Sequence, residues 1–434
     1  MAMQTGREAV TTNEPTSTNH AALAMVTTLF FMWGLLTSLN DILVPHLKLI
    51  FDLNYAEVML IQFCFFSAYF VFAIPSGKLI EKFGYKASMV AGLFTMGAGA
   101  FLFIPAASVP AFALFLSALI VLAAGMTILQ VSANPYVAVL GPAKTASSRL
   151  NLAQAFNSLG TTIAPWLGGL LILSGAAPAV EAVRAMPEAD RAIFRLHEAS
   201  SVKIPYLGLG LCLVLLAVTI WKFKLPAFNS AGDQSHDATG SEKSIWRHSR
   251  LVLGAIGIFV YVGAEVSIGS FMINYLSQPE IGNMSLQTAA RHVSLYWGGA
   301  MIGRFIGSGL LQKIRTGTLL GIAALTAFLL VIATMLSFGS VAVWTIVAIG
   351  LFNSIMFPSI FTLSIDGLGA MTGKGSGVLV MAIVGGALIP ELQGVVADRI
   401  GIHHAFFLPA ICYLYIAFFA FRSNKPHAEA LASS

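Results

Sequence analysis

Apolar residues fall into long blocks along this chain, separated by short segments rich in charged, Gly and Pro residues. A helix needs roughly 20 apolar residues to cross a bilayer core of about 30 Å. The pattern therefore predicts an all-α membrane protein with twelve transmembrane helices, six before residue 225 and six after residue 248. Their expected ranges are 21–46, 57–80, 87–106, 110–140, 149–174, 205–223, 250–276, 291–312, 317–337, 341–366, 374–398 and 403–422.

One long polar segment, LPAFNSAGDQSHDATGSEKS at 225–244, divides these helices into two sets of six. Two six-helix bundles joined by a cytoplasmic loop are typical of alternating-access carriers, whose binding site lies between the bundles near the midplane. The alternative from layout alone is some other twelve-helix membrane protein. The expected parts are a tail (1–20), an N-terminal bundle (21–224), a linker (225–248), a C-terminal bundle (249–422) and a second tail (423–434).

Composition supports a membrane protein, since 57% of the residues are hydrophobic and only 10% are charged. Soluble domains carry about 25% charged residues, so a water-soluble body of this size is excluded. The three cysteines lie in apolar runs with no metal-ligand spacing, which predicts free thiols and no metal site. The polar first 20 residues lack an apolar core and a cleavage site, so we expect no removable signal peptide.

Lysine and arginine predict the orientation. Sixteen of the 24 fall in the segments that are internal when the N-terminus is cytoplasmic, and seven fall in the external ones. Four of those seven lie in one longer external loop, 175–204, where the positive-inside rule is weak. We therefore expect a multi-pass protein of the bacterial inner (plasma) membrane with both termini in the cytoplasm.

The loop between the second and third spans reads GKLIEKFGYK (77–86). Its glycines permit a close helix approach and a tight turn, and its acid and lysines predict a charge latch on the cytoplasmic side. This loop resembles the signature loop of the major facilitator superfamily, with Glu in place of the usual Asp. Weaker echoes occur at 303–317 and 394–401. The gating residues predicted here are Gly77, Glu81, Lys82, Gly84 and Lys86.

Few ionisable residues lie within the spans, and each is a functional candidate by default. Asp41 is near the outer end of the first span, where a helix-end carboxylate is the plain alternative. Glu265 lies about 22 Å along the seventh span, near the middle of the membrane. Arg304 lies near the cytoplasmic end of the eighth span; we assign it to the gate, with a structural pairing to Glu265 as the alternative.

Amides are more numerous within the spans. Gln154 and Asn157 share one helix face, as do Gln130 and Asn134, because residues three or four apart project together. Singly, such amides serve as contacts between helices; together they fit the many hydroxyls of a sugar, whose ring an aromatic face can cover. The predicted substrate-binding residues are Ser38, Asn40, Gln130, Asn134, Gln154, Asn157, Asn274, Trp297 and Asn353.

Longer stretches resemble a known family. FFMWGLLTSLNDILVPHLK, ANPYVAVLGP and RLNLAQAFNSLG are similar to the fucose/proton symporters of the major facilitator superfamily, and TILQVSANPYV and LVLGAIGIFVYVGAEVSIGSF resemble their glucose/galactose transporter branch. The resemblance implies sugar uptake coupled to a cation, with Asp41 matching one key carboxylate of the fucose carriers. Their second carboxylate is replaced here by Gln130, which does not titrate. The acid of the seventh span, Glu265, matches the glucose/galactose branch, so we expect Asp41 to carry the proton, with Glu265 as its partner or substitute, and Gln130 to bind sugar hydroxyls.

The resulting hypothesis is proton-coupled uptake of a hexose such as glucose or galactose. Uptake of N-acetylglucosamine or fucose, and sodium in place of the proton, remain open. A drug/proton antiporter is a rival because GTTIAPWLGG (160–169) resembles an antiporter motif, although Gln154 and Asn157 argue against it. A sugar-sensing receptor is a weaker rival, and no catalytic set indicates an enzyme. We expect no cofactor besides the co-transported H+ or Na+, partners limited to a small-molecule sugar and the lipid bilayer without nucleic acid, and a monomer.

Overall fold

A computed structural model describes residues 17–51, 55–109, 111–171, 183, 186–226 and 245–424, and in these ranges the regular structure is helical, without strands. Most of the predicted linker and most of both predicted tails lie outside the described residues. The α-helices of the N-terminal half are α1 (His20–Phe51), α2 (Tyr55–Ser108), α3 (Phe112–Val139), α4 (Ala146–Leu171), α6 (Glu188–Ser200) and α7 (Lys203–Lys222). Those of the C-terminal half are α8 (Ser249–Leu276), α9 (Leu286–Leu310), α10 (Thr316–Leu336), α11 (Gly339–Asn353), α12 (Met356–Ile365), α13 (Thr372–Met381), α14 (Gly385–Ile400), α15 (Ile402–Ala405) and α16 (Phe407–Arg422).

Each of the twelve predicted spans coincides with helix in the described ranges. The second and third spans share α2, which turns at Gly84, where φ is 78°, a conformation that residues with a side chain rarely adopt. The tenth span is divided between α11 and α12, and the eleventh between α13 and α14. Nine helices among the described residues are long and apolar enough to cross a membrane; that count takes α2 once and omits the more polar α4 and α9. The prediction of an all-α membrane fold is confirmed.

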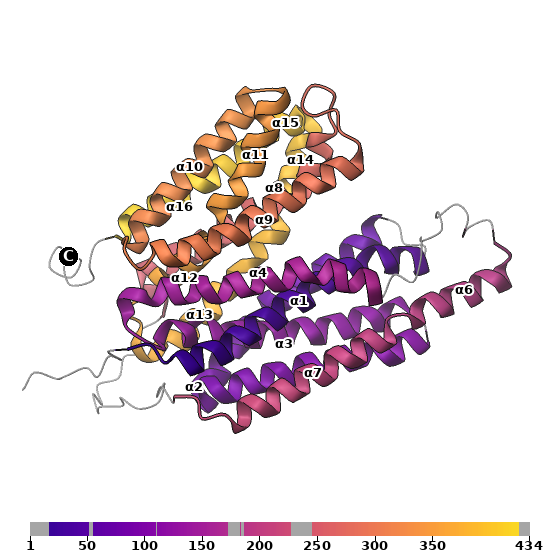
Figure 1. The fold of residues 1–434 in the computed structure, drawn as a ribbon, viewed down its shortest axis with the longest axis horizontal. Coiled ribbons are helices and arrows are strands. Elements are labelled where there is room, and N and C mark those ends of the chain that lie inside the picture. Colours follow the sequence, from indigo (N-terminus) through magenta and orange to yellow (C-terminus); the bar gives the residue numbers. More distant parts are fainter. Residues whose placement is uncertain are drawn as a thin grey trace, which may run out of the picture.

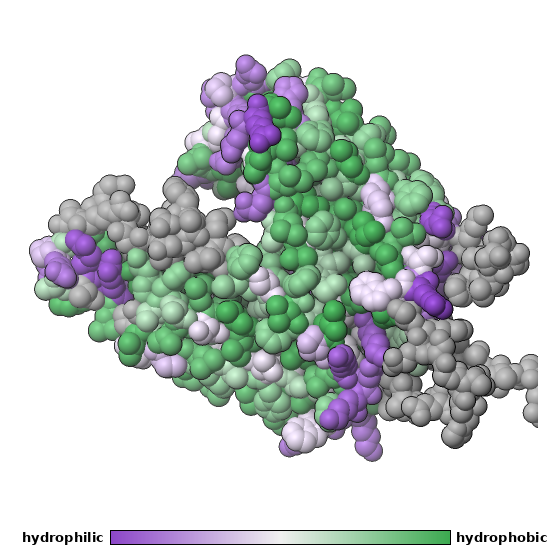
Figure 2. Space-filling model, turned by 180° about the vertical axis from the view of Figure 1, so that it is seen from behind, coloured by the Kyte–Doolittle hydropathy of each residue, from purple (hydrophilic) through white to green (hydrophobic). Residues whose placement is uncertain are grey.

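The helices form two groups that follow the order of the chain. In Figure 1 α1, α2, α3, α4, α6 and α7 lie together, and most helices from α8 onward form a second group above them, whereas α13 extends down beside the first group. The two groups meet at the end where α12 and α13 lie against α4 and α3, and they splay apart toward the other end (Figure 1). Apolar side chains cover most of the face seen in Figure 2, with hydrophilic ones at its margins, as expected for a body surrounded by lipid.

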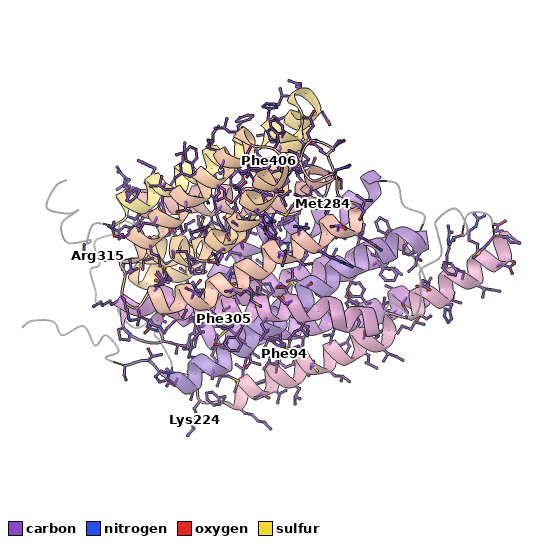
Figure 3. The ribbon with its side chains drawn as sticks, turned by 45° about the horizontal axis from the view of Figure 1, so that its top comes forward. Phe94, Lys224, Met284, Phe305, Arg315 and Phe406 are labelled. Carbon is purple, nitrogen blue, oxygen red and sulfur yellow. The ribbon has the colours of Figure 1, made fainter. Side chains whose placement is uncertain are left out.

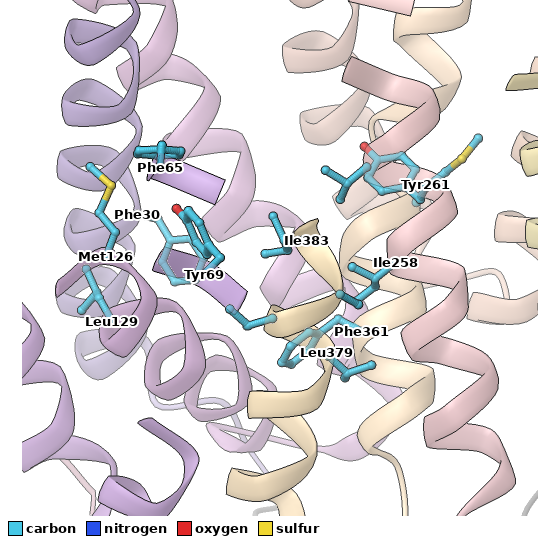
Figure 4. Close-up of a cluster of buried hydrophobic side chains, with 14 of the residues drawn as sticks. Phe30, Phe65, Tyr69, Met126, Leu129, Ile258, Tyr261, Phe361, Leu379 and Ile383 are labelled. Atoms are coloured by element: carbon cyan, nitrogen blue, oxygen red, sulfur yellow. The ribbon is translucent and has the colours of Figure 1, made fainter. Parts of the chain in front are cut away.

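One cluster of buried apolar side chains extends through both halves. Figure 4 shows Phe30, Phe65 and Tyr69 in the N-terminal half, separated by Ile383 from Tyr261 of the C-terminal half. Both tyrosines are almost wholly buried, at 2% and 1% exposure. A buried tyrosine hydroxyl needs a hydrogen-bond partner, so these two residues mark where polar groups enter the interior.

The external segment 175–204 differs from the prediction of a loop, because α6 occupies Glu188–Ser200. Pro187 precedes this helix, and Glu188 and Asp190 fall in its first turn, where acidic side chains interact favourably with the helix dipole. α6 continues outward in the direction of α7 (Figure 1). The segment was assigned to a loop because its charges were read as interruptions and not as one face of an amphipathic helix.

Candidate functional site

The two halves are joined at one end of the molecule, which we call the closed side and define by Gly77, Glu81, Gly373 and Lys374. Gly77 of α2 packs against Gly373 of α13 so closely that a Cβ at Gly77 would lie 3.0 Å from the Gly373 carbonyl oxygen. One turn further on, the Glu81 carboxylate lies 3.2 Å from Lys374 Nζ. The charge latch predicted for Glu81 therefore has a partner in the other half of the chain, not among the neighbouring lysines.

A series of hydroxyl groups continues this junction along α4. Ser147 Oγ lies 2.6 Å from Thr362 Oγ1 and accepts from Thr316 Oγ1 at 2.9 Å. Ser148 Oγ donates to the Ser308 carbonyl at 2.7 Å. Among the described residues the polar contact between the halves that lies furthest along α4 is the one between Thr162 and Met301.

Arg304 of α9 lies at the inner end of this junction and contacts three other helices or helix ends. Its Nη2 is 3.8 Å from Glu265 Oε1, and both side chains are largely buried, at 13% and 12% exposure. Nη1 donates to Ser158 Oγ of α4, and Nε donates to the Ser354 carbonyl at 3.3 Å. Arg304 was expected to belong to the gate or else to pair with Glu265, and the structure brings both roles together.

The Glu265 carboxylate is incompletely satisfied, because Oε1 has no hydrogen-bond partner within the described residues. A separation of 3.8 Å is too long for a direct hydrogen bond, so Glu265 and Arg304 attract each other mainly through charge. Burial makes separation of the two charges costly, whereas protonation of the acid removes its attraction to Arg304. Such a pair is suited to binding and releasing a proton.

Three tyrosines surround Asn353, which connects this pair to the C-terminal core. Asn353 Nδ2 donates to Tyr296 Oη at 2.8 Å, and Tyr413 Oη donates to Asn353 Oδ1 at 2.8 Å. Tyr261 Oη donates to the Asn353 carbonyl at 3.1 Å. Because Asn353 is fully buried with both ends of its amide bonded, it offers nothing to a sugar in this conformation. The predicted sugar contact is thus replaced here by contacts within the C-terminal half.

In the N-terminal half, Gln130 and Asn134 of α3 are buried, at 2% and 0% exposure. Gln130 Nε2 donates to Tyr69 Oη at 2.7 Å, whereas its Oε1 has no partner within the described residues. Neither Nδ2 nor Oδ1 of Asn134 has one there. Unpaired buried amides cost about 1–3 kcal/mol each, so both residues gain when a polar molecule reaches them.

Gln154 and Asn157 of α4 share the face that carries Ser158, the residue bonded to Arg304. Gln154 is 5% exposed, and Asn157 is half-buried with its Nδ2 donating to the Phe30 carbonyl of α1 at 2.9 Å. The two predicted amides therefore lie beside the place where Arg304 crosses between the halves. Phe156, on the same helix, meets Phe305 of α9 edge-on, with ring centroids 6.0 Å apart, where the two halves meet (Figure 3).

Trp297 lies toward the splayed end from the ion pair. It precedes Arg304 by seven residues and therefore lies on the same face of α9. Its ring packs over Gly269, the residue one turn beyond Glu265 on α8, where a Cβ would approach Trp297 Cζ2 to 3.1 Å. With 42% of its surface exposed, Trp297 presents an aromatic face one layer outward from Glu265 and Arg304. Asn274, further along α8, is also exposed.

The remaining predicted residues are less informative. Asn40 and Asp41 belong to α1, but their side chains lie outside the described part of the structure. Ser38 is half-buried. In the loop motif Lys82 is exposed, with Nζ 5.1 Å from the centroid of the Phe83 ring, and Lys86 is half-buried.

Comparison with known proteins agrees with this architecture. A family model described as Major Facilitator Superfamily matches residues 23–390. The chain belongs to the major facilitator superfamily. The predicted membership of this superfamily is thereby confirmed.

Two relatives show to which family within the superfamily the chain belongs. A glucose/galactose transporter of Brucella abortus is 52% identical over 404 residues, which cover 93% of this chain and 94% of the relative. An L-fucose-proton symporter of Escherichia coli is 36% identical over 409 residues, covering 92% and 93%. Within the superfamily the chain belongs to the family that contains these transporters, as its motifs had indicated.

A solved structure extends the likeness to three dimensions. The transporter FucP, in its outward conformation, superposes with a TM-score of 0.86 at 34% sequence identity, covering 93% of this chain and 99% of FucP. The halves of the present structure are likewise joined at one side and splayed at the other.

Several residues of the site were not found from the sequence. Lys374, Ser158 and the tyrosines around Asn353 come from segments far from their partners in the chain, and no local spacing connects them. A signal was available for the tyrosines, since Tyr261 and Tyr296 lie inside spans where a buried hydroxyl needs an acceptor.

Proposed function

We propose that this protein imports a hexose of the glucose/galactose type together with a proton, by alternating access, in a bacterial inner membrane. The observation that carries the proposal is the pair Glu265–Arg304, which bonds across the halves to Ser158 beside Gln154 and Asn157. At this pair a titratable acid lies next to polar groups suited to a sugar and to the junction between the two halves. The names of the Brucella abortus and Escherichia coli relatives supply the substrate class and the coupling ion.

The sugar is held mainly by the N-terminal half. Gln130 and Gln154 accept and donate hydrogen bonds to its hydroxyls, and Asn157, Ser38 and Asn40 complete the set from α4 and α1. The unpaired Gln130 Oε1 supports this assignment, because a sugar hydroxyl would supply its missing donor. Trp297 covers the C–H face of the ring from the C-terminal half, and Asn274 lies on the entry path.

Coupling rests on Asp41 and Glu265, because the amide of Gln130 cannot carry a proton. A proton that enters from the open side neutralises Glu265 and weakens its attraction to Arg304. Arg304 then has no charge partner at Glu265 and can exchange its hydrogen bonds, including the one to Ser158, so the junction between the halves can open. When the sugar leaves on the other side, the proton follows into water and the pair forms again.

The closed side is cytoplasmic in this proposal, because the predicted internal segments contain sixteen of the 24 lysines and arginines. The structure then corresponds to an outward-facing state. Asn134, whose buried amide has no hydrogen-bond partner in the described ranges, meets water or sugar once the closed side opens. The two bundles (21–224 and 249–422) move relative to each other about the linker at 225–248, both termini are cytoplasmic, and a monomer suffices for transport.

Competition for counterflow tests the substrate. Purified protein in liposomes preloaded with unlabelled glucose takes up labelled glucose from outside, in sodium-free buffer to exclude a sodium requirement. We expect excess external glucose or galactose to suppress the labelled uptake, with fucose and N-acetylglucosamine at least tenfold weaker. Counterflow abolished by omitting sodium, or suppressed best by fucose or N-acetylglucosamine, would reassign the ion or the sugar.

Gln154→Ala provides the site control for this assay, because it removes an amide next to the Arg304 crossing. We expect its apparent affinity for glucose to fall by about tenfold, the effect of one or two lost hydrogen bonds. Gln312→Ala is the matched variant, since Gln312 is exposed on the closed side. Equal affinities for the two variants would remove Gln154 from the sugar site.

A further inference from the structure

Pro135 leaves a backbone carbonyl of α3 without its helical partner. In an α-helix the N–H of residue i donates to the carbonyl of residue i−4, and proline has no N–H. The carbonyl affected by Pro135 is that of Val131. In the structure Ser376 Oγ of α13 donates to this oxygen at 2.7 Å. Ser376 is fully buried and belongs to the other half of the chain, 245 positions away.

The corresponding proline of the C-terminal half shows the same arrangement. Pro358, in the tenth span as Pro135 is in the fourth, has no N–H to offer the carbonyl of Ser354, which lies between α11 and α12. Arg304 Nε donates to that carbonyl at 3.3 Å. Both freed carbonyls are therefore bonded by side chains near the junction between the halves, and only the bond from Ser376 itself crosses the junction.

Small residues make the bond from Ser376 possible. α13 packs against α2 through Gly373 and Gly377, and a Cβ at Gly377 would lie 2.8 Å from the Ala73 carbonyl oxygen. This close approach holds α13 against the N-terminal half and brings Ser376 within reach of α3. Because the same surfaces must separate when the closed side opens, the bond cannot persist in both conformations.

We propose that Ser376 is a positioning residue of the transport cycle, whose hydroxyl stabilises the closed side by bonding the Val131 carbonyl that Pro135 leaves free. When the halves separate at this side, Val131 O passes from Ser376 to water, so the bond favours the outward-facing state alone. The inference rests on the alternating-access mechanism proposed above. Its test requires no sugar, so the two can fail separately.

The experiment measures how often the closed side opens. Ile80 of α2 is fully buried beside Gly373, and a cysteine there reacts with a bulky fluorescent maleimide only when α2 and α13 separate. The reporter Ile80→Cys is placed in a background in which Cys64, Cys212 and Cys412 are replaced by alanine. Labelling rates of the purified protein in detergent are compared for Ser376→Ala, Pro135→Ala, their combination, and Ser132→Ala. Ser132 is a buried serine of α3 that bonds only carbonyls of its own helix, Ile128 and Leu129.

We expect Ser376→Ala to raise the labelling rate about fivefold, the ratio that one ordinary hydrogen bond produces, and Ser132→Ala to leave it unchanged. Pro135→Ala restores a backbone N–H that bonds Val131 O within the helix, so in that background Ser376→Ala should raise the rate by less than twofold. An unchanged rate for Ser376→Ala in the original background overturns the proposal. So does an equal fivefold rise with and without Pro135, because Ser376 would then act through something other than the freed carbonyl.

Discussion

Glu265 Oε1 and Arg304 Nη2 lie 3.8 Å apart between α8 and α9, and the same guanidinium donates to Ser158 of the opposite half. A change of charge on one acid thus acts directly on a contact that holds the two halves together. The attraction between two such charges is strong in a poorly solvated site. This geometry explains how the proton and the conformational change can be linked without a long pathway.

Glu265→Gln should uncouple transport. The amide is close in size to the carboxylate but cannot take up a proton, so gradient-driven accumulation of glucose should fall at least tenfold while sugar exchange at equal pH persists. Glu280→Gln is the control, because Glu280 is exposed between α8 and α9. Accumulation that survives Glu265→Gln in full would exclude Glu265 from coupling.

Asp41→Asn tests the second acid in the same assay. If Asp41 binds the transported proton, this substitution also abolishes accumulation and spares exchange. Loss of exchange as well as accumulation would instead assign Asp41 to sugar binding. Comparison with Glu265→Gln identifies which acid carries the proton. Substitution of that acid should abolish gradient-driven accumulation and leave sugar exchange intact.

Lys374 and Glu81 should behave as a pair across the closed side. Their charged atoms lie 3.2 Å apart, so Lys374→Glu places two acids next to each other. Repulsion between these acids destabilises the contact of α2 with α13, and uptake should slow about two- to fivefold. The exchanged pair, Glu81→Lys with Lys374→Glu, should recover most of the rate. The effects are modest because the two side chains are 30% and 46% exposed, and exposed pairs contribute at most about 1 kcal/mol. Failure of the exchange to recover the rate would mean that the two charges act separately.

Asn353→Ala should lower stability, because it removes the buried amide that donates to Tyr296 Oη and accepts from Tyr413 Oη. We expect a loss of about 2–4 kcal/mol, seen as a lower Tm in detergent. Asn274→Ala, at an exposed position of α8, should leave the Tm unchanged. A Tm for Asn353→Ala equal to that of the unaltered protein would show that the tyrosines find other partners.

The sequence was sufficient for the helices of the described ranges. Runs of apolar residues broken by charges located every span, since the bilayer imposes one length on all of them. Spacing along single helices also placed Gln154 and Asn157 correctly on one face. Both predictions depend on neighbours within one helix, where geometry is fixed by the backbone.

Contacts between segments far apart in the chain could not be predicted from spacing along single helices. Ser376 and Val131 are 245 positions apart. Pro135 indicates from the sequence that the Val131 carbonyl lacks its helical donor, but the sequence does not show which side chain donates to that carbonyl. Asn353 was interpreted as a sugar ligand because an amide in a span is costly, but in this structure its amide bonds Tyr296 of α9 and Tyr413 of α16. α6 was missed because its charged residues looked like a loop until they were seen on one side of a helix.

The most direct test of coupled uptake is the accumulation of labelled glucose by liposomes that contain the purified protein, with an acidic exterior, an alkaline interior and no sodium. The account predicts that glucose rises severalfold above its external concentration and returns to equality when a protonophore collapses the gradient. Uptake that stops at equality despite the gradient, or accumulation that the protonophore leaves unchanged, would contradict proton-coupled import.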